Sequence, residues 1–412
     1  MKYSTVFKGI SWLFLSTIAS QVISLLTLPY ISRAYSESSL SVMGIMASAL
    51  VLLTILSTLR MEFYIVKKND NENKEFIPSL YLMSILSGIF LSPFLLIFFN
   101  YKNIEVSIHT ALLIISYTIL SFILNISLLN LTNKKKFATQ ASIRVVKAIT
   151  LLTSLWLLSS FEATGVILSL VISTSIPLIW YITKNHSEFT TVFSEFNNKK
   201  SIILLQLKTS YHAAIQAVLN VINIQFISFY VIIFGSSNLI AAYFFMERIV
   251  TAPLNLIASS LRQVIYKDLV EQKEYNNLLK RLSIYHVSLL LISLLVAAGF
   301  YLYGETLINF TLGDGWGLVY QLAVVYMPVL LCRIINIPTT SMYLTLDAMH
   351  KLSKYEKIDL ITKIIISTII YFLSPDFIVF MSIICLYICI YYVAINVILY
   401  IELFSMRNKN AQ

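Results

Sequence analysis

Four arginines lie inside long apolar stretches of the chain, where a charged side chain is costly. They are Arg60, Arg248, Arg262 and Arg333, and a fifth, Arg33, lies at the end of the first apolar stretch. A charge at the centre of a membrane-spanning helix costs roughly 2.5 to 3.5 kcal/mol, so such side chains normally face protein or water. A guanidinium group binds phosphate through two parallel hydrogen bonds and keeps its charge. These positions predict a cavity that accepts a phosphate or diphosphate group.

The predicted depth of these arginines separates two kinds of role. Arg248 and Arg333 fall near the middle of their apolar stretches, too deep to reach the membrane surface easily. A structural role is the alternative, because Arg60 with Glu62, or Arg333 with Glu247, can form buried ion pairs, and arginines near an interface can extend toward it. Substrate binding is therefore expected first of Arg248 and Arg333.

Glu247 is the one acidic residue predicted near the middle of the membrane. A buried carboxylate can titrate and couple transport to protons. It can equally neutralise an arginine and have no further role. Because consecutive residues project about 100° apart on a helix, Glu247 and Arg248 do not point together, and the partner of Glu247 is expected on another helix.

A polar stripe runs along the seventh apolar stretch at helical spacing. It consists of His212, Gln216, Asn220 and Asn223, which recur every three or four residues on one helix face. Such amides can hydrogen-bond sugar hydroxyls in a wet cavity, or they can join neighbouring membrane helices. Both interpretations stay open. His212 and His286 are interpreted as satisfied histidines near the cytoplasmic surface.

The composition predicts that these residues are positioned by membrane-spanning helices. Hydrophobic residues make up 58% of the 412 residues, charged residues only 12%, and the mean hydropathy is +0.80, values outside the soluble globular range. A spanning helix needs roughly 20 mostly apolar residues. We therefore expect an all-α protein with about twelve spans, at 10–32, 40–66, 76–99, 109–131, 143–161, 163–183, 209–234, 238–265, 282–303, 318–346, 358–374 and 377–403.

The basic residues outside these spans predict the orientation of the chain. Of 30 Lys and Arg, 24 fall in alternate loops, and only Arg33 and Lys102 fall on the other side. This bias predicts that both termini are cytoplasmic. The loop charges, which include 132–147 and 347–363, are then expected to set orientation and to have no part in substrate binding. The net charge of +10 therefore gives no support to a nucleic-acid partner.

A weak internal repeat predicts two lobes. With a shift of 202 residues, STLR at 57–60 falls on SSLR at 259–262, and Gln21 falls on Asn223. The predicted organisation is an N-lobe at 1–183, a cytoplasmic linker at 184–208, a C-lobe at 209–404 and a cytoplasmic tail at 405–412. Repeats with an even number of spans keep the same orientation, so the lobes are expected to flank a central cavity.

Several chemistries find no support in the sequence. No glycine-rich phosphate-binding loop is present, so the chain is not expected to hydrolyse ATP. The three cysteines, Cys332, Cys385 and Cys389, lie in apolar stretches without neighbouring His or acidic residues and are interpreted as packing residues. No metal or cofactor is expected, and the outward loops are too short for an extracytoplasmic catalytic domain.

Two segments resemble a known family. The stretch GISWLFLSTIASQVISLLTLPYISRAYS and the later ILSTLRMEFYIVKK are similar to the start of polysaccharide transporters, particularly O-antigen flippases of the Wzx type. This resemblance implies the multidrug/oligosaccharidyl-lipid/polysaccharide exporter fold. It also implies translocation of a polyprenyl-diphosphate-linked oligosaccharide between leaflets by alternating access and without ATP. Arg248 and Arg333 are the positions that fit the family's cationic cavity, and the related lipid II flippases generally have two more spans.

Other functions differ in the chemistry that they require. A multidrug antiporter of the same superfold is expected to have an acidic cavity for cationic drugs, and an O-antigen polymerase or a lipid-dependent glycosyltransferase needs large outward loops. A scaffold gives no reason for mid-membrane arginines.

The expected location is a bacterial inner membrane. The expected partners are the lipid-linked oligosaccharide, membrane lipids, and the polymerase and chain-length proteins of the same pathway, while sugar composition, coupling ion and oligomeric state stay open.

Overall fold

The computed structural model is helical throughout the part of the chain that it describes. Its described backbone comprises residues 2–66, 70–102, 104, 107–186, 189, 192, 196–272, 275–346, 348–373 and 376–410, and no strand occurs among them. The chain divides into two compact units, residues 1–241 and 242–412, which we describe separately. The predicted all-α fold is confirmed, whereas the lobes at 1–183 and 209–404 stay a prediction.

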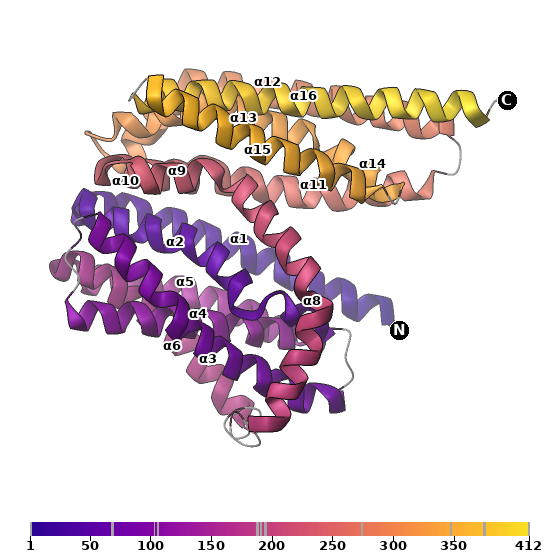
Figure 1. Cartoon of the computed structure of the whole chain (residues 1–412). Coiled ribbons are helices and arrows are strands. Elements are labelled where there is room, and N and C mark those ends of the chain that lie inside the picture. Colours follow the sequence, from indigo (N-terminus) through magenta and orange to yellow (C-terminus); the bar gives the residue numbers. More distant parts are fainter. Residues whose placement is uncertain are drawn as a thin grey trace. The chain divides into compact units, whose positions relative to one another are not determined.

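The first unit consists of helices that pack side by side as a bundle (Figure 1). They are α1 (Lys2–Ala34), α2 (Glu37–Thr58), the 3₁₀ turn η1 (Met61–Val66), α3 (Asp70–Tyr101), α4 (Ile108–Asn133), α5 (Phe137–Leu157), the 3₁₀ turn η2 (Ser159–Phe161), α6 (Glu162–Lys184), α8 (Phe196–Ile224) and α9 (Phe226–Phe234). Helix α1 packs on α5, α4 packs on both α3 and α6, and α8 packs across α2 and α3.

The second unit begins inside α10 (Ser237–Met246). It continues through the π-helix η3 (Glu247–Thr251), α11 (Ala252–Glu271), α12 (Tyr275–Leu312), α13 (Gly317–Ile335), α14 (Ile337–Thr345), α15 (Met349–Leu373) and α16 (Phe377–Asn410). Helix α13 packs between α12 and α16, α15 packs on α16, and α14 packs on α11. Pro253 and Pro338 lie in the first turns of α11 and α14.

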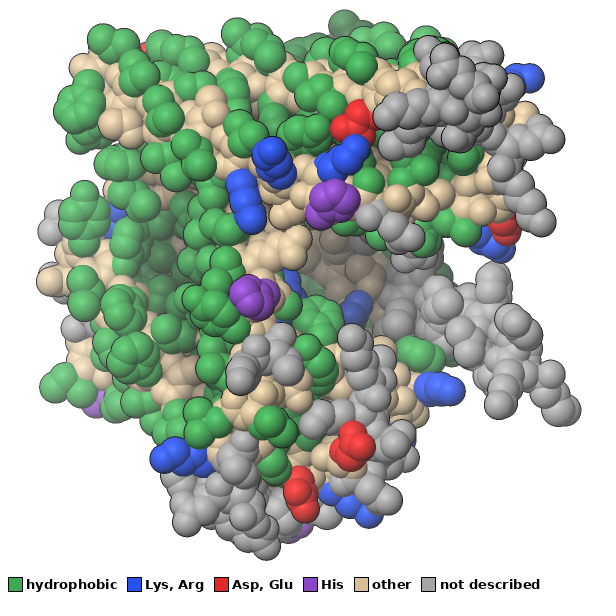
Figure 2. Space-filling view, turned by 45° about the vertical axis from the view of Figure 1, so that its right-hand side comes forward, with side chains coloured by type: hydrophobic (Ala, Val, Ile, Leu, Met, Phe, Trp, Pro, Cys, Tyr) green, Lys and Arg blue, Asp and Glu red, His purple; other side chains and the backbone are tan. Residues whose placement is uncertain are grey.

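Large apolar surfaces on these helices fit a lipid environment. Among the described residues, eight helices are long and apolar enough to cross a membrane, or nine if α8 and α9, which are bent by 67° to each other, form one span. Phe90, Phe310 and Phe372 are among the many exposed large apolar side chains, and hydrophobic side chains cover much of the face in Figure 2. The protein is therefore a multi-pass membrane protein, while the count of twelve spans and the cytoplasmic termini stay predictions.

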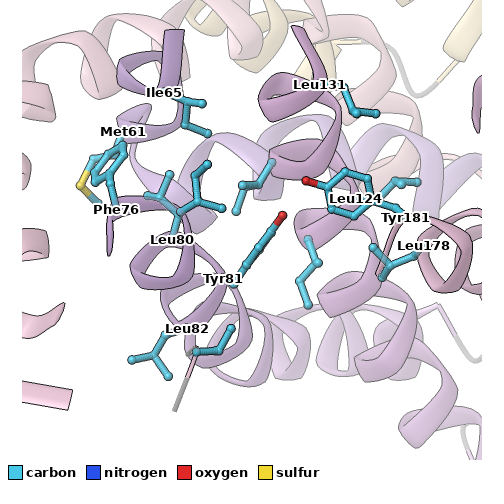
Figure 3. Close-up of a cluster of buried hydrophobic side chains, with 14 of the residues drawn as sticks. Met61, Ile65, Phe76, Leu80, Tyr81, Leu82, Leu124, Leu131, Leu178 and Tyr181 are labelled. Atoms are coloured by element: carbon cyan, nitrogen blue, oxygen red, sulfur yellow. The ribbon is translucent and has the colours of Figure 1, made fainter. Parts of the chain in front are cut away.

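A buried cluster of apolar side chains holds α3, α4 and α6 of the first unit together (Figure 3). Two polar contacts fix the register of these helices inside it. The hydroxyl groups of Tyr81 and Ser127 are 3.1 Å apart, and the side-chain amide of Asn130 donates to the Tyr181 hydroxyl at 2.7 Å. Buried polar groups that are hydrogen-bonded in this way add specificity to apolar packing.

Helix α2 ends earlier than the second apolar stretch, so the predicted span at 40–66 is wrong at its C-terminal end. Leu59 and Arg60 both adopt left-handed backbone angles, with φ of 48° and 64°, and end the helix after Thr58. The six residues that follow form η1, which packs against α3 and α4. Met61 and Ile65 of this turn are thus buried by packing on other helices, and the segment is not a continuation of the span.

Two basic residues assigned to loops by sequence lie in helices instead. Lys363 is only 4% exposed in the middle of α15. Arg144 lies in the second turn of α5, where its guanidinium donates to the Thr17 hydroxyl of α1 at 3.0 Å. The prediction that all basic residues of 132–147 and 347–363 are loop charges is therefore wrong for these two, and also for Lys147, Lys351, Lys354 and Lys357, which lie in the same two helices. A hydropathy window is dominated by the apolar neighbours of a single charge and does not show whether that charge is buried.

The carboxylate of Glu162 joins the start of α6 to the start of α2. Its Oε2 accepts hydrogen bonds from the Ser36 backbone N–H at 3.2 Å, from the Ser36 hydroxyl at 2.7 Å and from the Ser39 hydroxyl at 2.6 Å. Glu162→Ala is therefore expected to lower the free energy of unfolding by about 1 to 3 kcal/mol, measured by denaturant titration of the purified protein in detergent. The control Glu37→Ala removes an exposed carboxylate beside the same helix start, and an equal loss in both variants would contradict the predicted role of Glu162.

Candidate functional site

Arg333 lies in the last turn of α13 among tyrosine side chains of the second unit. Its guanidinium carbon is 5.7 Å from the ring centroid of Tyr326, and its side chain is hydrogen-bonded to Tyr392 of α16. The ring of Tyr326 also meets the ring of Tyr243 edge to face at 6.5 Å. A guanidinium against aromatic rings keeps its charge while its planar face is covered. Its remaining N–H groups are then held in a defined orientation.

A second cation lies near Arg333, on the neighbouring helix α15. The ammonium group of Lys363 is 2.7 Å from Asp359 Oδ2, and both residues are almost completely buried. Arg333 and Lys363 interact electrostatically, and the Lys363 ammonium is 5.9 Å from the ring centroid of Tyr391. We call Arg333, Asp359 and Lys363 the ionic cluster.

The ionic cluster and its neighbour Glu356 together hold two cations and two carboxylates, which differ in burial. Two cations face one buried carboxylate, and a second carboxylate, that of the half-buried Glu356, also interacts electrostatically with Lys363. Asp359 Oδ1 has no hydrogen-bond partner among the described residues. Buried charges that are incompletely compensated are expensive and are therefore frequent at functional sites.

Arg248 and Glu247 lie together in the π-helix η3, between α10 and α11. The guanidinium carbon of Arg248 is 5.2 Å from the ring centroid of Phe244, and Glu247 interacts electrostatically with Tyr326, the residue that also contacts Arg333. Single-turn π-helices disrupt the regular hydrogen-bond ladder and are frequent at functional sites. The sequence pattern gave no indication of this bulge.

Arg60 lines a cavity of about 340 Å³ in the first unit, together with Phe63, Tyr64 and Ala213. Its guanidinium lies 4.8 Å from the ring centroid of Phe63 and its Nη1 is 3.9 Å from Glu62 Oε1. Burial raises the pKa of Glu62, to which the Thr58 hydroxyl donates a hydrogen bond. The contact of Arg60 with Glu62 is long for a charge-assisted hydrogen bond, so Glu62 compensates the guanidinium only weakly.

The other predicted site residues are distributed over both units. In the first unit, Arg33 is exposed and donates to the Pro29 carbonyl at 2.5 Å, and on α8 the side chains of Gln216 and Asn220 are exposed whereas Asn223 is buried. In the second unit, Arg262 is exposed on α11. Arg333 and Glu247 are linked through Tyr326. That the five arginines line one phosphate-binding cavity stays a prediction.

Comparison with known proteins identifies the family. The model of the family described as "Polysaccharide biosynthesis protein" matches residues 6–266, more than half of the chain. The chain belongs to this family. No curated protein sequence matches the chain.

Solved structures similar to this polysaccharide biosynthesis protein are transporters. An inward-facing multidrug resistance MATE family transporter of the MOP superfamily has a TM-score of 0.66 at 13% identity, covering 94% of this chain and 96% of its own. The Vibrio cholerae MATE transporter VcmN has a TM-score of 0.57 at 12% identity, covering 98% and 97%. A Pyrococcus furiosus MOP superfamily transporter, described as having a binding pocket of reversed polarity, has a TM-score of 0.55 at 12% identity, covering 97% and 96%. These similarities establish a MATE-like fold.

Sequence reasoning on this polysaccharide biosynthesis protein missed Asp359, Lys363 and Arg144. A signal for the first two was present, because an acidic residue four positions before a lysine forms an ion pair on one helix face. Assigning 347–363 to a loop concealed it. The partner of Arg144 is 127 residues away at Thr17, a distance in sequence over which no local pattern applies.

Proposed function

We propose that the protein is a flippase that moves a polyprenyl-diphosphate-linked oligosaccharide, such as an O-antigen repeat unit, from the cytoplasmic to the periplasmic leaflet. Membership of the polysaccharide biosynthesis family and the transporter fold both support this function. The ionic cluster is the observation that carries it. It places the buried Lys363 and the half-buried Arg333 beside the buried carboxylate of Asp359 and the half-buried one of Glu356, inside a multi-pass membrane protein.

In this proposal Arg333 binds the diphosphate. Its planar guanidinium can donate two parallel hydrogen bonds to phosphate oxygens, and its contacts with Tyr326 and Tyr392 orient it before the substrate arrives. Lys363 adds a second positive charge from α15. A low-dielectric environment strengthens both interactions relative to water, which offsets the cost of removing the diphosphate from the aqueous surface.

The remaining predicted residues have supporting roles in this proposal. Arg248, Arg60, Arg262 and Arg33 supply further contacts for the diphosphate as the substrate moves, and Gln216, Asn220 and Asn223 of α8 hydrogen-bond sugar hydroxyls. Movement follows alternating access between two lobes, without ATP hydrolysis. The proposed location is the bacterial inner membrane, beside the polymerase and chain-length proteins of the same pathway.

Glu247 has two proposed roles, as a proton-coupling group or as an ion-pair partner of an arginine. Its electrostatic interaction with Tyr326, which also contacts Arg333, supports a role close to the substrate. Translocation by Glu247→Gln, compared with the natural protein at an intact and a collapsed pH gradient, separates the two roles.

Deletion of the gene is expected to leave the lipid-linked oligosaccharide on the cytoplasmic leaflet. The measurement is the sidedness of that intermediate, tested by its accessibility to an impermeant glycosidase in intact spheroplasts and in inverted vesicles. If single repeat units accumulate on the periplasmic leaflet, the protein is a polymerase. If no intermediate accumulates and resistance to cationic drugs falls, it is a multidrug antiporter of the same fold. Either result contradicts the proposed function.

A further inference from the structure

Three helices of the second unit meet at His286 through polar side chains. His286 of α12 has its Nδ1 at 3.0 Å from the Leu282 carbonyl oxygen and at 3.1 Å from the Tyr400 hydroxyl of α16. Its Nε2 is 3.1 Å from the hydroxyl of Thr339 on α14, a residue with no exposed surface. The Thr339 hydroxyl in turn contacts the side-chain amide of Asn396 on α16, which is also hydrogen-bonded to the His286 side chain itself.

The number of hydrogens in this network depends on the charge of His286. A carbonyl oxygen can only accept, so Nδ1 carries a hydrogen and donates it to Leu282. The Tyr400 hydroxyl is free to accept from the same Nδ1–H, because its own hydrogen goes to Ser283. The Thr339 hydroxyl has one hydrogen, which can be donated either to the Asn396 carbonyl oxygen or to Nε2, but not to both.

Two arrangements of the Thr339 hydrogen follow from this count. In the first, the Asn396 amide nitrogen donates to Thr339, Thr339 donates to Nε2, and the imidazole is neutral. In the second, Nε2 carries a hydrogen and donates it to Thr339, Thr339 donates to the Asn396 carbonyl oxygen, and the ring is an imidazolium. The observed contact, with Thr339 donating to Asn396 Oδ1, matches the second arrangement. Conversion needs one added proton, a rotation of the Thr339 hydroxyl and a flip of the Asn396 amide.

We propose that His286 is a proton-binding site. Its charge state determines the direction of the hydrogen bonds made by Thr339 and Asn396, so proton binding changes the contacts of α14 with α12 and α16. A proton taken from water adds to Nε2, and no covalent bond between heavy atoms forms or breaks. Imidazole is the side chain suited to such exchange at physiological pH.

The position of α14 links this proton site to the ionic cluster. Arg333 is in the last turn of α13, Asn336 alone separates α13 from α14, and Thr339 is in the first turn of α14. A change in the hydrogen bonds of Thr339 therefore acts on the segment that continues directly from the proposed diphosphate-binding arginine. This coupling, though not the proton binding itself, rests on the proposed function.

The helices around His286 carry few other titratable groups near this network. Tyr400 of α16 is in direct contact. Arg281 on α12 is 3.9 Å from Asp268 of α11, and Glu402 on α16 pairs at 3.0 Å with Lys351 of α15. Helix α14 carries no acidic or basic residue, only Tyr343, and α13 carries Arg333. Each of the four charged groups of α11, α12, α15 and α16 named here is thus compensated by an opposite charge.

The proton site is tested by ¹⁵N NMR of histidine-labelled full-length protein in nanodiscs, with His286→Gln identifying the signal. We expect Nδ1 to be protonated throughout and Nε2 to gain its hydrogen as the pH falls. Asn396→Asp removes the amide donor, so Thr339 must donate to the carboxylate and Nε2 should stay protonated to a pH about one unit or more higher. The signal of His350, which is exposed on α15, should be the same in Asn396→Asp as in the natural protein.

Two results would overturn the proton site. One is a neutral His286 that carries its hydrogen on Nε2, because the count above then fails. The other concerns the pH range over which Nε2 stays protonated. If Asn396→Asp extends that range equally in a Thr339→Val background, the added carboxylate acts on His286 directly through its charge, and Thr339 does not connect the two side chains. Folding of each variant is checked by its gel-filtration profile, and the tautomer measurement on the natural sequence needs no substitution at the network.

The coupling is tested by the pH profile of translocation in proteoliposomes, with a fluorescent polyprenyl-diphosphate oligosaccharide as the probe. His286→Gln should flatten the profile, whereas His350→Gln should keep it. A natural profile in His286→Gln, or a profile abolished by Glu247→Gln alone, would overturn the coupling while the flippase function stands. If the natural protein moves no probe but His286 titrates as described, the proposed function fails and the proton site stands.

Discussion

Replacing Arg333 with alanine is expected to lower oligosaccharide translocation about 10- to 100-fold while the protein remains inserted in the membrane. The change removes charge-assisted hydrogen bonds to the diphosphate, each worth about 1.5 to 3 kcal/mol. Arg333→Lys should keep part of the activity, because an ammonium group retains the charge but not the planar pair of donors. Translocation is measured with the fluorescent lipid-linked probe in proteoliposomes, at equal amounts of inserted protein.

Arg281→Ala is the matched control for Arg333. It removes the same side chain from a position on α12 that is 51% exposed and 3.9 Å from Asp268, and it should leave translocation near the natural rate. Arg248→Ala should also lower translocation, because Arg248 is the second deep arginine. Normal glycan export by both Arg333→Ala and Arg248→Ala would contradict the proposed site.

Replacing Lys363 with methionine is expected to destabilise the protein by about 3 to 5 kcal/mol. The change leaves the carboxylate of Asp359, which is 1% exposed, without the ammonium group at 2.7 Å that compensates it. The double variant Asp359→Leu with Lys363→Met should recover most of this loss, because it replaces a buried ion pair with apolar side chains. The free energy of unfolding is measured by denaturant titration in detergent, as a double-mutant cycle.

The pair of Lys351 and Glu402 provides the matched control. It joins α15 to α16 at 3.0 Å, but its side chains are 37% and 20% exposed. Because water screens a partly exposed pair, Lys351→Met should cost no more than about 1 kcal/mol. A similar loss of stability in both lysine variants, or no recovery in the double variant, would show that burial of the Asp359 pair is not what determines the effect.

Most of the helices were predictable from sequence because they coincide with long apolar stretches. The position of Arg333 near the middle of its stretch follows from the same pattern. The end of α2 was not predictable in this way. Apart from Arg60 and Glu62, residues 59–66 remain apolar through the turn. The left-handed residues Leu59 and Arg60 are not the glycine that usually marks such a helix end. Packing of η1 on α3 and α4 determines this turn, and no local pattern encodes it.

The polar contacts of the second unit were also only partly predictable from sequence. His286 was interpreted correctly as a satisfied histidine, because both of its ring nitrogens have partners. Its partners Thr339 and Asn396 are 53 and 110 positions further along the chain, so their meeting depends on how α12, α14 and α16 pack. Lys363 was misassigned although its partner is close in sequence. Asp359 is only four residues away, but the segment that contains both residues was counted as a loop.

The ion pair of α15 also has a consequence for how the chain enters the membrane during its synthesis. Helix α15 is not among the described helices that are apolar enough to insert unaided, since it carries Glu356, Asp359 and Lys363. Asp359 and Lys363 are one helical turn apart and neutralise each other as soon as that turn forms. The charges of Asp359 and Lys363 are therefore already compensated when α15 enters the membrane, before any neighbouring helix is available. Separating the pair onto two helices would make insertion of each one depend on the other.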